Sequence, residues 1–167
     1  MERLTALYDR MVSYYAGEPA RSQHFVKVHS FARRIGLAEG LDSRAQLTLE
    51  AAALVHDIGI KPAEAIYGSC EGPYQEALGP APARELLESL DFPADVTERV
   101  CYLVGHHHTY TGIDGTDYQI LVEADFLVNL FENETRQEPR REALKRIFKT
   151  ECGSTLCRVM FGLGNEE

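Results

Sequence analysis

Apolar side chains recur along this chain at intervals of three and four residues, which places them on one face of a helix. Residues 2–15 show this spacing, and Gly17 and Pro19 follow as signals for the end of a helix. The spacing returns over residues 22–38 and 43–56. Because no stretch of useful length alternates apolar and polar residues as a strand would, we expect an all-α fold.

The third predicted helix runs into the string DIGIKP. Gly59 suits a left-handed cap at the end of a helix, and Pro62 is expected to block continuation. Residues 66–80 are rich in glycine and proline and predict a loop with one short helical piece at most. Further helices are predicted over residues 81–90, from Pro93 to about His107, and over 118–132.

The C-terminal part of the chain predicts two more helices. Thr135 and Glu138 resemble a capping box before the first, and the second is expected from Gly153 onward. The chain shows no repeat, linker or low-complexity tract. We therefore expect one helical domain over residues 1–167, with a core of about 20–132 and C-terminal helices within 137–163.

The charge of the chain limits its partners. There are 17 basic and 26 acidic residues, which gives a formal net charge of −9. Binding to nucleic acid without sequence preference requires a basic surface, and anionic membranes repel an acidic protein, so we expect neither partner. A small phosphorylated substrate remains compatible, because a bound metal ion can reverse the local field.

The chain also favours a cytoplasmic location. Residues 1–16 are amphipathic and lack the continuous apolar stretch of a secretory signal. The four cysteines form no CxxC pair, and Cys101 lies in the apolar run VCYLV. Free thiols are therefore expected rather than disulfides.

His24 is the first candidate for chemistry. It shares a predicted helix face with the apolar residues at offsets of 4, 7, 8 and 11 positions, whereas His29 falls off that face and is expected at the surface. The buried position of His24 is consistent with a metal ligand. Taken alone, however, such a position favours a core histidine that is hydrogen-bonded to a neighbour.

Two further sites place ligand-type side chains in apolar surroundings. His56 and Asp57 stand together where an apolar helix ends, although Asp57 could instead cap the loop. Asp125 lies within ILVEADFLVNL, where an unpaired carboxylate would cost several kcal/mol of desolvation. Glu123 is expected on the opposite, solvated side of the same helix. A metal ion, or a buried arginine or lysine, would remove the cost at Asp125.

Residues 106–108 are three consecutive histidines, and at most two of them can face the same site on a helix. His107 continues the apolar face of its helix and His106 flanks that face. His108 best fits a surface histidine at the end of the helix.

The order His24, then His56-Asp57 in HDIGIK, then Asp125 resembles the H…HD…D signature of the HD superfamily. The strings HFVKV, AAALVHDIG and LVEADFLVN around these residues resemble the family as well. The resemblance covers about residues 20–132. It implies an orthogonal helical bundle with a buried divalent metal site formed by these four residues.

The resemblance also implies metal-dependent hydrolysis of a nucleotide or another small phosphate ester, with Asp57, Lys61, His106 and His107 as the catalytic residues. Lys61 matches a lysine that contacts phosphate. Glu76, His106 and His107 would hold a second metal ion, bridged to the first by Asp57. The ligand set suits iron, manganese, cobalt, nickel or zinc, as one or two ions. The GYP extension of relatives that cleave cyclic dinucleotides is absent.

Two other functions stay open at this point. Some relatives with this ligand set hold two iron ions and oxidise their substrate with oxygen, and a non-catalytic module that binds metal or nucleotide would use the same residues. The substrate is not identified, and a homodimer is compatible with the sequence.

Overall fold

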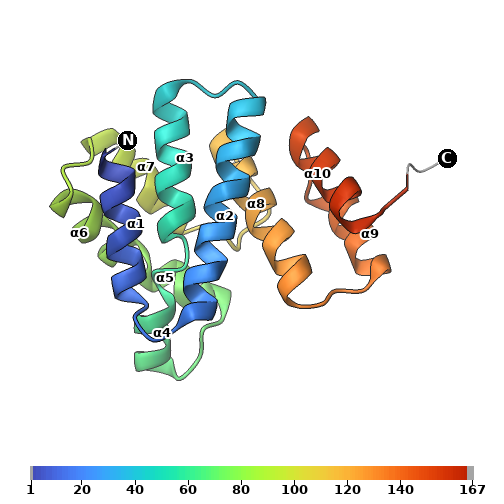
Figure 1. Ribbon diagram of the computed structural model, residues 1–167. Helices are drawn as coiled ribbons and strands as arrows, with labels where there is room; N and C mark the ends of the chain where they lie inside the picture. The colour runs from blue at the N-terminus through green and yellow to red at the C-terminus, as the bar shows by residue number, and fades with distance from the viewer. Residues whose placement is uncertain (1, 165–167) are drawn as a thin grey trace.

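The computed structural model describes residues 2–164, and every regular element within this range is a helix, which confirms the all-α prediction. The helices follow one another through short connections (Figure 1). In chain order they are α1 (Glu2–Tyr14), α2 (Pro19–Ala38), α3 (Ser43–Val55), α4 (Ile60–Tyr67), α5 (Gly72–Leu78), α6 (Pro80–Ser89), α7 (Ala94–Val104), α8 (Thr116–Glu132), α9 (Gln137–Arg146) and α10 (Glu151–Phe161).

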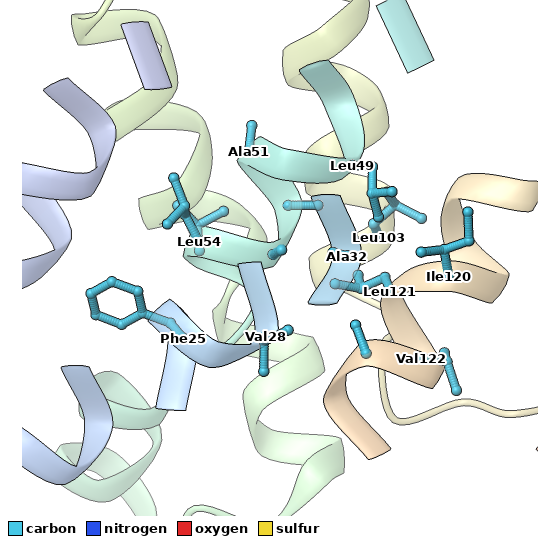
Figure 2. Packing of buried hydrophobic residues seen from close by; sticks show 14 of the residues in the cluster. Phe25, Val28, Ala32, Leu49, Ala51, Leu54, Leu103, Ile120, Leu121 and Val122 are labelled. Atoms are coloured by element: carbon cyan, nitrogen blue, oxygen red, sulfur yellow. The ribbon is translucent and has the colours of Figure 1, made fainter. Parts of the chain in front are cut away.

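Helix α2 lies at the centre and packs against α3 on one side and α8 on the other, while α1 and α7 also pack against α3 (Figure 1). Residues 51–53 are alanines and fully buried, which lets the backbones of neighbouring helices approach closely. The inward faces of these helices form one apolar cluster (Figure 2). Each large aliphatic side chain buried there contributes about 1.5–3 kcal/mol to folding. The central members include Val28, Ala32, Leu49, Leu54, Leu103 and Leu121.

The segment predicted as a loop at residues 66–80 is instead largely helical. Pro62 lies in the first turn of α4, where its missing N–H would have no helical partner, so it starts this helix rather than blocking one. Gly59 is not left-handed: its φ is −70°. A Cβ there would lie 2.5 Å from the carbonyl oxygen of Gln75, so glycine is required for the close approach of α5 to the start of α4.

Glu123 is wrongly predicted as a surface residue, because its side chain is completely buried. Its carboxylate accepts hydrogen bonds from the backbone N–H groups of Lys149 (2.6 Å) and Thr150 (2.9 Å) and from Gln119 Nε2 (2.8 Å). The Thr150 hydroxyl donates to it as well. Glu123 therefore fastens the connection between α9 and α10 to α8, and these helices cover the side of α8 that the sequence leaves to solvent (Figure 1).

Helix α9 begins at Gln137, inside the predicted range of 137–163, whereas α10 begins two residues before the predicted Gly153. Arg136, and not Thr135, precedes α9, and no side-chain hydrogen bond caps this helix, so the capping box is absent. Thr150 caps α10 by accepting from the N–H of Gly153 (3.0 Å), which places the start of α10 at Glu151.

The cysteines are free thiols as predicted, and Cys101 is buried. Among the described residues, no helix combines the length and the apolar character needed to cross a bilayer.

Candidate metal centre

The turn that follows α3 carries the first two ligand-type side chains. His56 is fully buried, and its Nδ1–H donates to the carbonyl of Ala53 (2.9 Å). Because a carbonyl can only accept, this hydrogen bond leaves the Nε2 lone pair pointing the other way. Two hydroxyl groups from the end of α1 hold the backbone of the turn: Tyr15 donates to the carbonyl of Asp57 (2.6 Å) and Tyr14 to that of Ile58 (3.0 Å).

His24 of α2 and Asp125 of α8 meet this turn. His24 Nε2 lies 3.3 Å from His56 Nε2, 3.1 Å from Asp125 Oδ1 and 3.5 Å from Asp57 Oδ2. His56 Nε2 lies 3.4 Å from Asp57 Oδ2 and 3.7 Å from Asp125 Oδ1. Side chains far apart in the sequence therefore bring two ring nitrogens and two carboxylates to one point.

A second group of ligand-type atoms adjoins the first. Asp57 Oδ1 lies 3.5 Å from His107 Nε2, and the His108 ring packs beside that of His107 with 4.0 Å between the centroids. The ligand-type atoms of Asp57, His107 and His108 lie within 4.8 Å of one another, as do those of His24, His56 and Asp57. The two oxygens of Asp57 are thus divided between the groups.

The structure does not bring His106 into either group and places His108 there instead. His106 Nδ1–H donates to the carbonyl of Tyr102 (2.7 Å), and its ring stacks on the Tyr102 ring. Since α7 ends at Val104 and the chain then turns, the helical phase that singles out His106 no longer holds at these positions. Glu76 stays outside both groups, and its carboxylate accepts from the N–H of His108 (2.9 Å). Glu76 thereby positions the histidine loop.

Lys61 also lies apart from the two groups. Its ammonium group donates to the carbonyl of Tyr14 (2.6 Å) and pairs with Glu18 Oε1 (3.0 Å). These contacts tie the start of α4 to the connection between α1 and α2. The phosphate contact that the family resemblance implies for Lys61 stays a prediction.

A cavity of about 300 Å³ opens beside the first group. Asn129 lines it and donates to Asp125 Oδ1 (2.8 Å), which fixes that carboxylate. Tyr67 and Tyr74 stack on each other with 4.3 Å between the ring centroids, and neither lines the cavity. The lining residues besides the candidate ligands include Arg21, Ile60, Gln75, Asn129 and Glu132. The sequence pattern does not single out Arg21 or Glu132. Arg21 lies one helical turn before His24, and Glu132 lies two turns after Asp125.

The buried carboxylates control the protonation of His24. Burial alone would lower the pKa of this histidine, but the hydrogen bond to Asp125 and the negative charge of Asp57 raise it to about 9. Burial lowers the pKa of His56, because no hydrogen bond to a carboxylate compensates for the lost solvation. Although burial opposes it, the neighbouring histidines hold the pKa of Asp57 below its usual range.

In the second group, too, one histidine has a raised pKa and the other a lowered one. Burial opposes the charged form of His107, yet the Asp57 carboxylate, 3.5 Å from Nε2, raises its pKa. Burial and the neighbouring His107 lower the pKa of His108 to about 4, so this ring is neutral at physiological pH. A neutral imidazole is the form that binds a metal ion.

These residues fit a divalent metal ion. The Nε2 atoms of His107 and His108 are buried and, within residues 2–164, have no hydrogen-bond partner. At His56 a nitrogen lone pair faces the oxygens of Asp57 and Asp125, and lone pairs that converge in this way need a cation or a proton between them. Imidazole nitrogens with carboxylate oxygens are the ligand set of first-row divalent ions.

We expect metal affinity to rise with pH between roughly pH 6 and 9. The pKa of His24 is about 9 in the metal-free protein, so a metal ion must displace its proton, and each pH unit below that value costs about tenfold in affinity. The same raised pKa stabilises the metal-free fold below pH about 6.5, and this contribution is lost as the pH rises through about 9. Calorimetric titration in two buffers of different ionisation enthalpy counts the released protons. Binding without proton release at pH 7 would contradict this prediction.

The chain was also compared with known proteins. A family model described as an HD domain matches residues 21–146, a range that includes His24, the His56-Asp57 pair, the three histidines at 106–108 and Asp125. No curated protein and no solved structure matches the chain.

Proposed function

Since the chain belongs to the HD domain family, we propose that it is a metal-dependent phosphohydrolase that acts on a nucleotide or another small phosphate ester. The observation that carries this proposal is the division of the Asp57 oxygens between two groups of histidines beside a cavity of about 300 Å³. A shared carboxylate could bridge a pair of metal ions, and such pairs act in phosphate-ester hydrolysis.

In this proposal His24, His56, Asp57 and Asp125 hold one ion. Asp57 also contributes to a second position together with His107 and His108. When bound, such ions supply Lewis acidity toward a phosphoryl oxygen and toward water.

Arg21 supplies the positive charge that a phosphorylated substrate would meet. Among the described residues that line the cavity, it is the only arginine or lysine. Its guanidinium group pairs with Glu18 (2.9 Å) and Glu64 (2.6 Å), while Nη1 is buried without a hydrogen-bond partner among residues 2–164. A phosphate oxygen would give Nη1 a strong, charge-assisted partner. We therefore place on Arg21 the phosphate contact expected for Lys61.

Replacing Arg21 by alanine is expected to raise the KM for a phosphorylated substrate by roughly 10- to 100-fold, with a smaller change in kcat, because a charge-assisted contact to bound substrate is lost. Lys61→Met is expected to change KM much less, since Lys61 lies outside the cavity. Arg44→Ala, which breaks an exposed ion pair with Asp95, is the control. Steady-state kinetics of the three variants check the assignment. A raised KM in Lys61→Met with an unchanged KM in Arg21→Ala would reverse it.

The proposed reaction is tested by measuring phosphate release. The protein is stripped of metal with a chelator and reloaded separately with manganese, iron, cobalt, nickel or zinc. It is then incubated with nucleoside mono-, di- and triphosphates and with simple phosphate esters. Release that depends on the added ion is the expected result. If no ion gives release above the stripped protein with any substrate, the proposed reaction is wrong.

The same division of Asp57 between two groups favours a second candidate, oxidation of a substrate with oxygen at a pair of iron ions. Oxygen consumption by the iron-loaded protein, together with a mixed-valent signal in electron paramagnetic resonance, would support it over hydrolysis. Tight binding of a nucleotide without turnover in either assay would indicate a regulatory module.

A further inference from the structure

Three polar residues of α8 lie along the cavity. Asp125, Asn129 and Glu132 are spaced by four and three positions, which places them on one face of the helix, and all three line the cavity. Glu132 is the last residue of α8 and is partly exposed. Among residues 2–164, His24 is the candidate ligand that pairs with its carboxylate.

The two ring nitrogens of His24 have different partners. Nε2 faces Asp57, Asp125 and His56, while Nδ1–H donates to Glu132 Oε2 (2.8 Å). The other oxygen of Glu132 pairs with the ammonium group of Lys27 (2.6 Å). The carboxylate is therefore held between a surface cation and a ring that reaches into the site.

The other two deeply buried histidines are oriented differently. The Nδ1–H of His56 donates to the carbonyl of Ala53 (2.9 Å), and that of His107 to the carbonyl of Val104 (2.8 Å). Each of these contacts is made to the backbone at the end of a helix, three residues earlier in the chain. His24 lies in the second turn of α2, where the carbonyl groups beside it already accept helix hydrogen bonds, so a side chain is needed to set its orientation.

We propose that Glu132 is a positioning residue for metal binding. Its carboxylate keeps the proton of His24 on Nδ1 and so directs the Nε2 lone pair at the ion. A carboxylate behind a metal-binding histidine fixes the ring and makes it a stronger ligand, and losing such a partner costs about 10- to 100-fold in metal affinity. This inference rests on the proposed metal site and does not depend on the reaction performed there.

The test measures zinc affinity of the full chain by competition with a chromophoric chelator. Glu132→Ala is expected to weaken binding by about 10- to 100-fold. Glu132→Gln is expected to lose less, because its amide oxygen can still accept from His24 Nδ1–H. Lys27→Met removes the salt bridge and leaves Glu132 beside His24, so its affinity is expected to stay within about threefold of the unmodified protein.

A spectroscopic measurement separates positioning from a general structural role. In the zinc-loaded protein the Nδ1–H proton of His24 should give a protected signal in proton–nitrogen NMR, assigned by its absence in His24→Gln. The signal should persist in Glu132→Gln and Lys27→Met and exchange rapidly with water in Glu132→Ala. The thermal midpoint of each metal-free variant shows whether the fold is intact. If Glu132→Ala does not fold, the other two variants still test the proposal. Glu132→Gln is expected to bind zinc more weakly than Lys27→Met.

Zinc affinity in folded Glu132→Ala within twofold of the unmodified protein would overturn the role of Glu132 while leaving the metal site in place. Equal affinities for Glu132→Gln and Lys27→Met would overturn it in the same way. If the unmodified protein binds neither zinc nor manganese, iron, cobalt or nickel, the proposed metal site is wrong. The role inferred for Glu132 is then wrong as well.

Discussion

Asp57→Asn is expected to abolish retention of metal and to lower phosphohydrolase activity by about a thousandfold or more. Asp57 Oδ2 lies 3.4 Å from His56 Nε2 and Oδ1 lies 3.5 Å from His107 Nε2. Asparagine keeps the size of the side chain but turns one of these oxygens into an NH₂ donor, which cannot bind a cation. Whichever way the amide is oriented, one of the two groups loses its shared ligand.

Elemental analysis and phosphate release together measure this effect. Asp114→Asn is the matched control, because Asp114 is an exposed carboxylate paired with Arg99 at a distance of 2.9 Å and does not line the cavity. It is expected to keep both metal and activity. An Asp57→Asn protein that is folded, retains a full complement of metal and turns over normally would exclude the shared-carboxylate site.

Glu123→Ala is expected to lower the free energy of unfolding by about 3–5 kcal/mol, one of the largest stability effects available in this fold. The carboxylate of Glu123 is fully buried and accepts hydrogen bonds from the backbone of Lys149 and Thr150 and from Gln119 Nε2. Removing it leaves these donors buried without an acceptor. The thermal midpoint should fall by roughly 10 °C, as expected for a chain of this size.

Glu39→Ala is the control for this variant. Glu39 also accepts a backbone hydrogen bond from the start of α10, at Cys152 (2.8 Å), but Glu39 is only half-buried, so water can reach the N–H group that its removal frees. We expect a change of about 1 kcal/mol or less. Chemical unfolding of the metal-free proteins compares the two. If Glu123→Ala lowers the free energy of unfolding no more than Glu39→Ala does, the buried carboxylate contributes little to stability.

The sequence predicts the central helices because they depend on local spacing, and the family resemblance predicts which residues meet between them. His24 and Asp125 each interrupt an apolar face, and a polar side chain in such a place needs a partner. This requirement makes each residue a candidate, and the resemblance to the HD superfamily is what assigns the two to one site, although they lie on helices that are far apart in the chain.

What the sequence misses depends on packing between distant segments. Its pattern assigns α8 one buried face, but α9 and α10 cover the back of this helix, so Glu123 and Asp125 are both buried. The region of α4 and α5 has the composition of a loop, and it is helical because Gly59 allows the two helices to touch. His108 replaces His106 because the helix ends before both of them. In each case the deciding contact lies outside the local pattern.

The hydroxyl groups of Tyr14 and Tyr15 reach the backbone of the turn that contains Asp57. Both tyrosines precede residue 21, where the match to the HD domain begins. The part of the chain that forms the site therefore begins before the segment that the family model matches. A fragment trimmed to that segment, or a chimera that exchanges the first helix between relatives, would keep every candidate ligand and still lose the scaffold that sets the position of Asp57.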